Sequence, residues 1–397
     1  MAKKSHSNTL ALIAVISIIA VVSVSGCVSQ GFFEGIFGKV GDIFGIDVVK
    51  ASRQVSSVGV VNPLTIDRVW TLPQSKIIPE TNLQLFMEIS NKDTDPSKTI
   101  FTSVDLFDSG VMKDSGGSNY CNSYPRPKGT NQCGPSVCVA SSSFGAGDGN
   151  PCELKSGSTK QITFDMQAPS AEEIANVITK TKLNYRLMYP YVGSTNFEIL
   201  AVSYDEILRR QKDGKALTTN LIDTKSSGPI KIDVELGTPY VITATENSES
   251  LPATVSPKVY IILKLRNAGS GSLMDSKIPK ECPDDTGEKH PCFRVYFPKD
   301  FAVSTKISAK TGEYQNVEPT SKEDFECKDE GDNVVCSNIK EIDLFKSESE
   351  PFQFIINNIK DLPEGVPYRT NLIKAEVRYY YELRGSAEVT IDPTLVG

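Results

Sequence analysis

The stretch that decides the fold occurs twice, as KLNYRLMYPYVGS at residues 182–194 and as KAEVRYYYELRGS at residues 374–386. Five positions are identical at a constant offset of 192: Lys182/Lys374, Arg186/Arg378, Tyr189/Tyr381, Gly193/Gly385 and Ser194/Ser386. Apolar residues alternate along the second copy with a period of two, which is typical of a half-buried β-strand. The two stretches are therefore predicted to be equivalent strands of a duplicated unit.

Two further pairs of segments repeat upstream, in the same order. ITFDM at 162–166 corresponds to FQFII at 352–356 at an offset of 190. LFMEISN at 85–91 corresponds to IILKLRN at 261–267 at an offset of 176, and both copies end in asparagine. Insertions in loops produce such small changes of spacing. Three matches in one order indicate an internal duplication.

The duplication predicts an all-β chain with two tandem domains. The first domain covers residues 51–210 and carries a cysteine-rich insertion at 111–157, and the second covers 229–397. A polar linker at 211–228 separates them. Short strands between turn signals, in units of this length, suggest that each domain is an antiparallel β-sandwich.

One short helix is expected within the first domain. Ser170 and Glu173 have the spacing of a capping box, and Ile174, Val177 and Ile178 follow at helical spacing. The sequence therefore predicts a helix that begins at Ser170, just before the repeated strand at 182–194.

The strand pattern resembles that of immunoglobulin-like domains. A tyrosine-rich strand after a short helix or turn is similar to their later strands. The apolar strand that ends at Asn267 and runs into Ala268-Gly269-Ser270-Gly271 resembles the early strand of CARDB-like domains. Such modules are common in archaeal and bacterial surface proteins. The resemblance covers most of residues 60–397 and implies tandem immunoglobulin-like domains in a prokaryotic, most readily archaeal, surface protein.

A hydrophobic segment near the N-terminus places the rest of the chain. Lys3-Lys4 precedes an apolar run over residues 10–24, and small residues follow before Cys27. This layout is typical of a secretory signal. Its ending, Val24-Ser25-Gly26-Cys27, resembles the lipobox of prokaryotic lipoproteins, in which the signal is removed before the cysteine and lipid is attached to the sulfur. The resemblance implies that Cys27 is the lipidation site.

An uncleaved membrane-spanning helix is the alternative for residues 1–27, because a span needs about 20 apolar residues and this segment barely supplies them. Both interpretations place the remaining chain on the extracytoplasmic face of the cell membrane, held by lipid or by the helix. Residues 28–50 form a stem with apolar residues at helical spacing. The stem either lies on the membrane surface as an amphipathic helix or acts as a flexible tether.

The cysteines predict a disulfide-braced protein. The chain has nine, and lipidation of Cys27 would leave an even number for pairing outside the reducing cytoplasm. Cys327 and Cys336 flank a strong turn signal, as do Cys282 and Cys292, so each pair is expected to form a bridge. The first-half cysteines are also disulfide candidates, but the residues leave their pairing open: Cys121, Cys133, Cys138 and Cys152.

Residues that could carry catalysis are few. The chain has two histidines, His6 in the signal and His290 in a loop before Cys292. We find no phosphate-binding loop, dinucleotide fingerprint or His-Glu-x-x-His motif, so no catalytic residue, cofactor or enzymatic activity is predicted. Acidic turns such as the one with Asp93 and Asp95 raise a calcium hypothesis. They lack the spacing of a calcium-binding loop, and no metal site is predicted.

Charge and aromatic content narrow the class of partner. The formal net charge is −7, with 49 acidic and 42 basic residues, which argues against binding to nucleic acid. Trp70, the single tryptophan, lies in an apolar run and is predicted to be in the core rather than in a sugar-binding platform. Tyr185, Tyr189 and Tyr191 alternate along a strand and are predicted to pack inside.

Together these features imply a membrane-anchored surface lipoprotein with a non-catalytic role. It would bind other surface proteins or glycans, in adhesion or in the organisation of the envelope. The alternative is a structural subunit of a surface filament or envelope complex that assembles by pairing exposed strand edges. A third interpretation is a solute receptor or enzyme that uses the insertion at 111–157.

Overall fold

The computed structural model describes most of the chain after the stem. The described residues are 49–58, 60–74, 76–113, 152–237, 240–243, 259–283, 288–299, 317–319, 324–356 and 361–395. Within them the protein consists mainly of β-strands in several, mostly antiparallel, sheets, with one α-helix, α3 (Tyr204–Asp213). The all-β class is thus confirmed. None of the described helices is long and apolar enough to cross a membrane.

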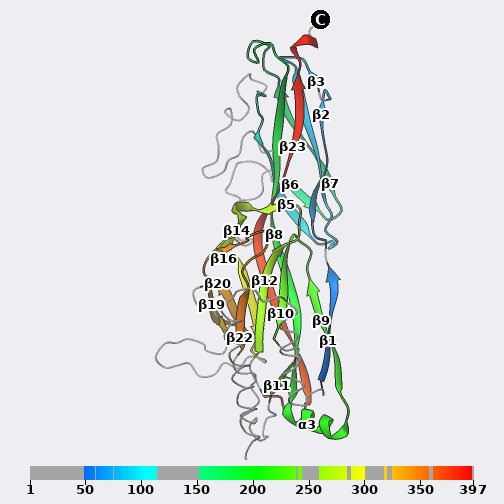
Figure 1. Cartoon of the computed structure of the whole chain (residues 1–397), viewed down its shortest axis with the longest axis vertical. Coiled ribbons are helices and arrows are strands. Elements are labelled where there is room, and N and C mark those ends of the chain that lie inside the picture. Colours follow the sequence, from blue (N-terminus) through cyan, green and yellow to red (C-terminus); the bar gives the residue numbers. More distant parts are fainter. Residues whose placement is uncertain are drawn as a thin grey trace, which may run out of the picture.

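Two very long strands form the axis of the molecule. β8 (Thr179–Ser203) and β23 (Tyr368–Ile391) pair antiparallel without interruption, from Tyr368 opposite Val202 to Ile391 opposite Thr179. At about 3.3 Å per residue, a ladder of this length extends about 80 Å. We call this pair of strands the spine, and Figure 1 shows it running along the long axis of the molecule.

The repeated stretches that decide the fold lie at the centre of the spine. Tyr189 and Tyr381 are equivalent positions of the two copies, and they lie directly opposite each other in the ladder. An approximate two-fold axis between these tyrosines therefore relates the two copies. Arg186 lies opposite Arg384 in the ladder. The same axis relates this pair to Arg378 and Val192, which also lie opposite each other.

Each copy has its own smaller sheet, and the strands of the two sheets are paired in equivalent registers. The first has the order β2-β4-β7 and the second β10-β12-β22-β18. Leu85 lies opposite Phe164 in the first sheet, and Ile261 lies opposite Phe354 in the second. These pairs are related by the two upstream offsets found in the sequence. The strands are β2 (Leu64–Leu72), β4 (Asn82–Asn91), β7 (Thr159–Gln167), β10 (Ile230–Leu236), β12 (Val259–Asn267), β22 (Phe352–Ile356) and β18 (Val317–Pro319).

The asparagines that end both copies of the early strand make equivalent turns. The side chain of Asn91 accepts a hydrogen bond from the N–H of Asp93 and donates one to the carbonyl of Leu154. The side chain of Asn267 accepts from the N–H of Gly269 and donates to the carbonyl of Gly271. Asparagine suits this position because its short amide can replace main-chain partners in a turn.

The smaller sheets and the spine enclose one continuous hydrophobic core. Alternate residues of β4, β7, β12 and β22 are buried in the same cluster as the inward-facing residues of the spine. Tyr189, Tyr191, Tyr379 and Tyr381 lie in this cluster at the centre of the molecule, as expected for the tyrosine-rich strands. The two stretches assigned to separate domains therefore share a core and a sheet in the structure, since each of them contributes one strand to the spine.

Shorter strands complete the sheets. β1 runs parallel to β9 at one edge of the large sheet, and Val49 lies opposite Leu217. These strands are β1 (Val49–Val58), β3 (Lys76–Ile77), β5 (Thr99–Asp108), β6 (Cys152–Lys155), β9 (Leu217–Lys225), β11 (Tyr240–Thr243), β13 (Ser272–Leu273), β14 (Lys277–Ile278), β15 (Glu281–Pro283), β16 (Lys289–Pro291), β17 (Phe293–Pro298), β19 (Phe325–Glu330), β20 (Asn333–Asn338) and β21 (Ile342–Asp343), with the 3₁₀ helices η2 (Met274–Ser276) and η3 (Pro393–Leu395).

The helix predicted from Ser170 does not form. Its capping box is present, because the N–H of Ser170 donates to Glu173 and the N–H of Glu173 donates to the Ser170 hydroxyl. The chain then makes turns only, since Ala175 and Asn176 have positive φ angles of 52° and 56°. Ile174 is buried, but Val177 and Ile178 remain exposed, so packing does not favour further helical turns there.

The predicted linker at 211–228 is instead part of the folded body. It carries the last turn of α3 and the strand β9 (Leu217–Lys225). Leu217 and Leu221 are buried in a second small core with Val49 and Ile207, which holds α3 against the sheet. The polar residues of this segment thus surround a strand rather than a flexible connection.

Candidate functional site

The structure forms both disulfides that the second half predicts. Cys327 and Cys336 lie directly opposite each other in the β19–β20 hairpin, with their Cα atoms 3.9 Å apart. Cys282 and Cys292 join the ends of the β15–β16 hairpin, with Cα atoms 5.2 Å apart. Cys152 begins β6. The remaining predicted site residues fall outside the described residues: Cys27, Cys121, Cys133 and Cys138.

The residues considered for catalysis or metal binding contact neighbouring residues of the fold. His290 lies in β16 opposite Cys282, with its Nε2 atom 3.8 Å from the carboxylate of Glu288. Asp93 is buried, accepts a hydrogen bond of 2.6 Å from the Tyr191 hydroxyl and another from the N–H of Asp95. Over the described ranges, no three His, Cys, Asp or Glu residues gather as a metal site.

Trp70 is not in the core, contrary to the prediction. It lies in β2 opposite Phe86, and both Leu85 and Met87 beside Phe86 point inward and are fully buried. The reason is a bulge in β2 between Ile66 and Arg68. An extra residue reverses the alternation of faces, so that Trp70 emerges on the outer face of the sheet.

On that outer face Trp70 is held in one orientation by two neighbours. Its ring stacks on Phe86, with centroids 5.3 Å apart and planes inclined by 11°. The guanidinium of Arg68 lies 4.8 Å from the centroid of the Trp70 ring. Stacking and cation–π contacts of this kind stabilise the arrangement of an aromatic side chain.

A hollow of about 320 Å³ opens beside Trp70, between β2 and the far end of β23. Trp70, Val69 and Ala387 give it apolar walls, and polar groups of Gln74, Thr71, Ser386 and Glu388 surround it. The carboxylate of Glu388 also lies 3.5 Å from the ammonium group of exposed Lys180. The lining is more polar than that of most small-molecule sites, and the volume lies at the lower end of their range.

The aromatic pair belongs to one copy of the duplication only. Phe86 corresponds to Ile262 at the offset that relates β4 to β12, and Glu235 lies opposite Ile262 where Trp70 lies opposite Phe86. The fold that both copies share therefore does not require aromatic residues at this position.

Only part of this site had a signal in the sequence. Trp70 stood out as the single tryptophan, but the bulge that turns it outward had none. Ser386 is the last residue of the repeated stretch and Glu388 lies just beyond it, and neither could be placed near Trp70 without the three-dimensional structure. The sequence matches no protein-family model and no curated protein.

Proposed function

We propose that the chain is a membrane-anchored extracytoplasmic lipoprotein, lipidated at Cys27, that acts as a non-catalytic module binding a glycan. In this proposal each copy of the duplication is an immunoglobulin-like β-sandwich, made by a smaller sheet and half of the spine. The lipobox-like ending of the N-terminal segment and the two disulfides support an extracytoplasmic location.

The observation that carries the proposal is the separation between the anchored end and the hollow. Val49, the first described residue, lies opposite Leu217, and both pack in one small core with Ile207 of α3. The hollow lies near the other end of the spine, at Ser386 and Glu388. The ladder between Tyr368 and Ser386 spans roughly 60 Å. A chain attached through its N-terminus would therefore hold the hollow well above the membrane.

The chemistry of the hollow favours a saccharide as its ligand. The carbon-bound hydrogens of a sugar ring can pack on the apolar surface of Trp70, which is half-buried. Hydroxyl groups of the sugar both donate and accept hydrogen bonds, so they fit the Glu388 carboxylate, the Gln74 amide and the Ser386 hydroxyl.

Replacement of Trp70 with alanine is expected to weaken glycan binding at least tenfold, which corresponds to about 1.4 kcal/mol. The purified full-length protein in detergent would be applied to a glycan array, and the affinity for the bound glycan would then be compared between variants. Tyr260→Ala is the matched control, because Tyr260 is an aromatic residue of β12 in the second copy and is 41% exposed. Equal binding by Trp70→Ala and the wild type would contradict this site.

A second candidate function is assembly through strand pairing. β1 forms one end of the large sheet, and nine of its ten residues pair with β9, its single partner among the described strands. An edge strand of this length can accept a strand from a neighbouring protein. At the opposite end of the sheet, β19 instead carries a charged residue at four of its six positions and is bridged to β20. Chemical crosslinking on native membranes tests this function, and exclusively monomeric protein would contradict it.

A further inference from the structure

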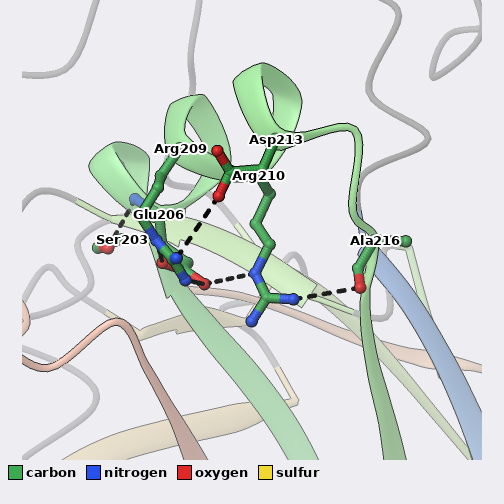
Figure 2. Close-up of polar contacts among 6 residues, drawn as sticks. All are labelled: Ser203, Glu206, Arg209, Arg210, Asp213 and Ala216. Atoms are coloured by element: carbon green, nitrogen blue, oxygen red, sulfur yellow. Dashed lines mark hydrogen bonds and ion pairs between the residues drawn. The ribbon is translucent and has the colours of Figure 1, made fainter.

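α3 is a rigidly built helix at the end of the molecule where the chain emerges from the stem. The hydroxyl of Ser203 accepts from the N–H of Glu206 at its start, and Gly214 ends it with a φ of 63°. The Glu206 carboxylate accepts hydrogen bonds of 2.8 Å and 2.6 Å from the Nε atoms of Arg209 and Arg210 (Figure 2). The hydrogen bond from Arg209 in particular holds the pKa of Glu206 below its usual range.

Four of the exposed residues of α3 and the following turn are apolar or basic: Leu208, Arg209, Lys212 and Lys215. We call them the α3 face. Leu208 is 45% exposed and the Arg209 side chain 58%. Arg209 is balanced by Glu206 and by Asp213 at 3.7 Å. Lys212 and Lys215 are exposed and form no ion pair with any described residue, so they leave positive charge on this surface.

The α3 face lies next to the point where the stem joins the body. Val49 packs in one small core with Ile207 of α3 and with Leu217, which follows the helix. The stem covers residues 28–50, and residues 28–48 of it separate Cys27 from Val49. Such a segment spans about 70 Å when fully extended and about 30 Å as a helix. With the stem in either conformation, a chain anchored at or before Cys27 can bring α3 to the membrane surface.

The distribution of charge favours one orientation of the molecule on the membrane. The whole chain has a formal net charge of −7, so an anionic membrane repels most of its surface. Exposed lysines beside an exposed leucine have the opposite preference, because lysines attract anionic headgroups and an apolar side chain enters the interface. The two effects together would hold the molecule with α3 downward and the spine pointing outward.

We infer that the α3 face rests on the membrane surface, with Lys212 and Lys215 in contact with anionic phospholipid headgroups. This inference rests on the anchoring part of the proposed function and adds the partner and orientation of that end. It makes the membrane surface itself a second point of attachment, distinct from the lipid or helix of the N-terminal segment.

Amine labelling of the full-length protein tests the inference. Protein extracted from its native membrane is reconstituted into vesicles of phosphatidylcholine alone, or of phosphatidylcholine and phosphatidylglycerol in a molar ratio of two to one. The initial rate of lysine acetylation is then measured by mass spectrometry. We expect Lys212 and Lys215 to react at least threefold more slowly in the anionic vesicles. Lys180, which is 72% exposed at the opposite end of the spine, is the internal reference and should react equally in both.

A pair of variants separates headgroup contact from simple shielding. Lys212→Glu should remove the protection of Lys215 in anionic vesicles, whereas Lys182→Glu, an exposed lysine in the distal half of β8, should leave it intact. Circular dichroism melting would establish that both variants fold. If the protein floats with the vesicles but Lys215 is labelled equally in the two lipids, the membrane contact of the α3 face is overturned and the proposed anchoring is not. Failure of the wild-type protein to float with either vesicle would instead overturn the proposed anchoring.

Discussion

Gly228→Ala is expected to destabilise the protein by about 3 kcal/mol or more, judged from the cost of a strained backbone together with an overpacked core. Gly228 has a φ of +117°, which residues with a side chain rarely adopt. A Cβ atom there would lie 2.5 Å from the Tyr191 ring and 2.8 Å from the Tyr379 hydroxyl. Both tyrosines belong to the spine, so the clash falls at the centre of the shared core. Urea unfolding of the full chain measures the effect.

Gly157→Ala is the matched control for this prediction. Gly157 also has a positive φ, of +73°, but no atom lies within 4 Å of the position that a Cβ would take. Its replacement should cost only the backbone strain, about 1–2 kcal/mol. If Gly228→Ala cost no more than Gly157→Ala, the segment around Gly228 would not be packed on Tyr191 and Tyr379 of the spine.

Cys327→Ser is expected to lower the free energy of unfolding by roughly 2–4 kcal/mol in the oxidised protein. The bridge to Cys336 constrains the unfolded chain over a sequence separation of 9 residues. It also ties β19, at the edge of the large sheet, to β20.

Thermal unfolding with and without reductant measures this contribution. The double variant Cys327→Ser/Cys336→Ser should match the single variant, because both lack the same crosslink. Under reducing conditions the wild type should lose most of its additional stability over the two variants. An oxidised wild type that melts at the temperature of the single variant would mean that the two cysteines are not bridged in solution.

The strands of the smaller sheets could be predicted from the sequence because period-two alternation is a local property. The offsets that relate residues 85–91 to 261–267 and 162–166 to 352–356 recur in the registers of the sheets. The length of the spine could not be predicted. A glycine such as Gly193 commonly marks the end of a strand, yet β8 continues to Ser203. The residue instead allows close approach, since a Cβ there would lie 3.1 Å from the carbonyl oxygen of Ile230.

The candidate site could not be predicted from the sequence, for a different physical reason. A single extra residue in β2 reverses which face Trp70 occupies, and a bulge has no reliable sequence signal. The partners of Trp70 in the hollow come from β23, near the other end of the sequence. The capping residues of α3, Ser203 and Glu206, have the same spacing as Ser170 and Glu173. Only Ser203 and Glu206 start a helix, because the chain after Glu173 turns at Ala175 and Asn176, which have positive φ angles.

The intact mass of the protein extracted from its native membrane tests the central claim most directly. The account predicts a chain that begins at Cys27, carries added lipid and lacks the thiol hydrogens of its remaining cysteines. Such a mass would establish the lipid anchor and the disulfides in one experiment. A chain that retains residues 1–26 without lipid would contradict the lipoprotein assignment and would make the N-terminal segment a membrane-spanning anchor.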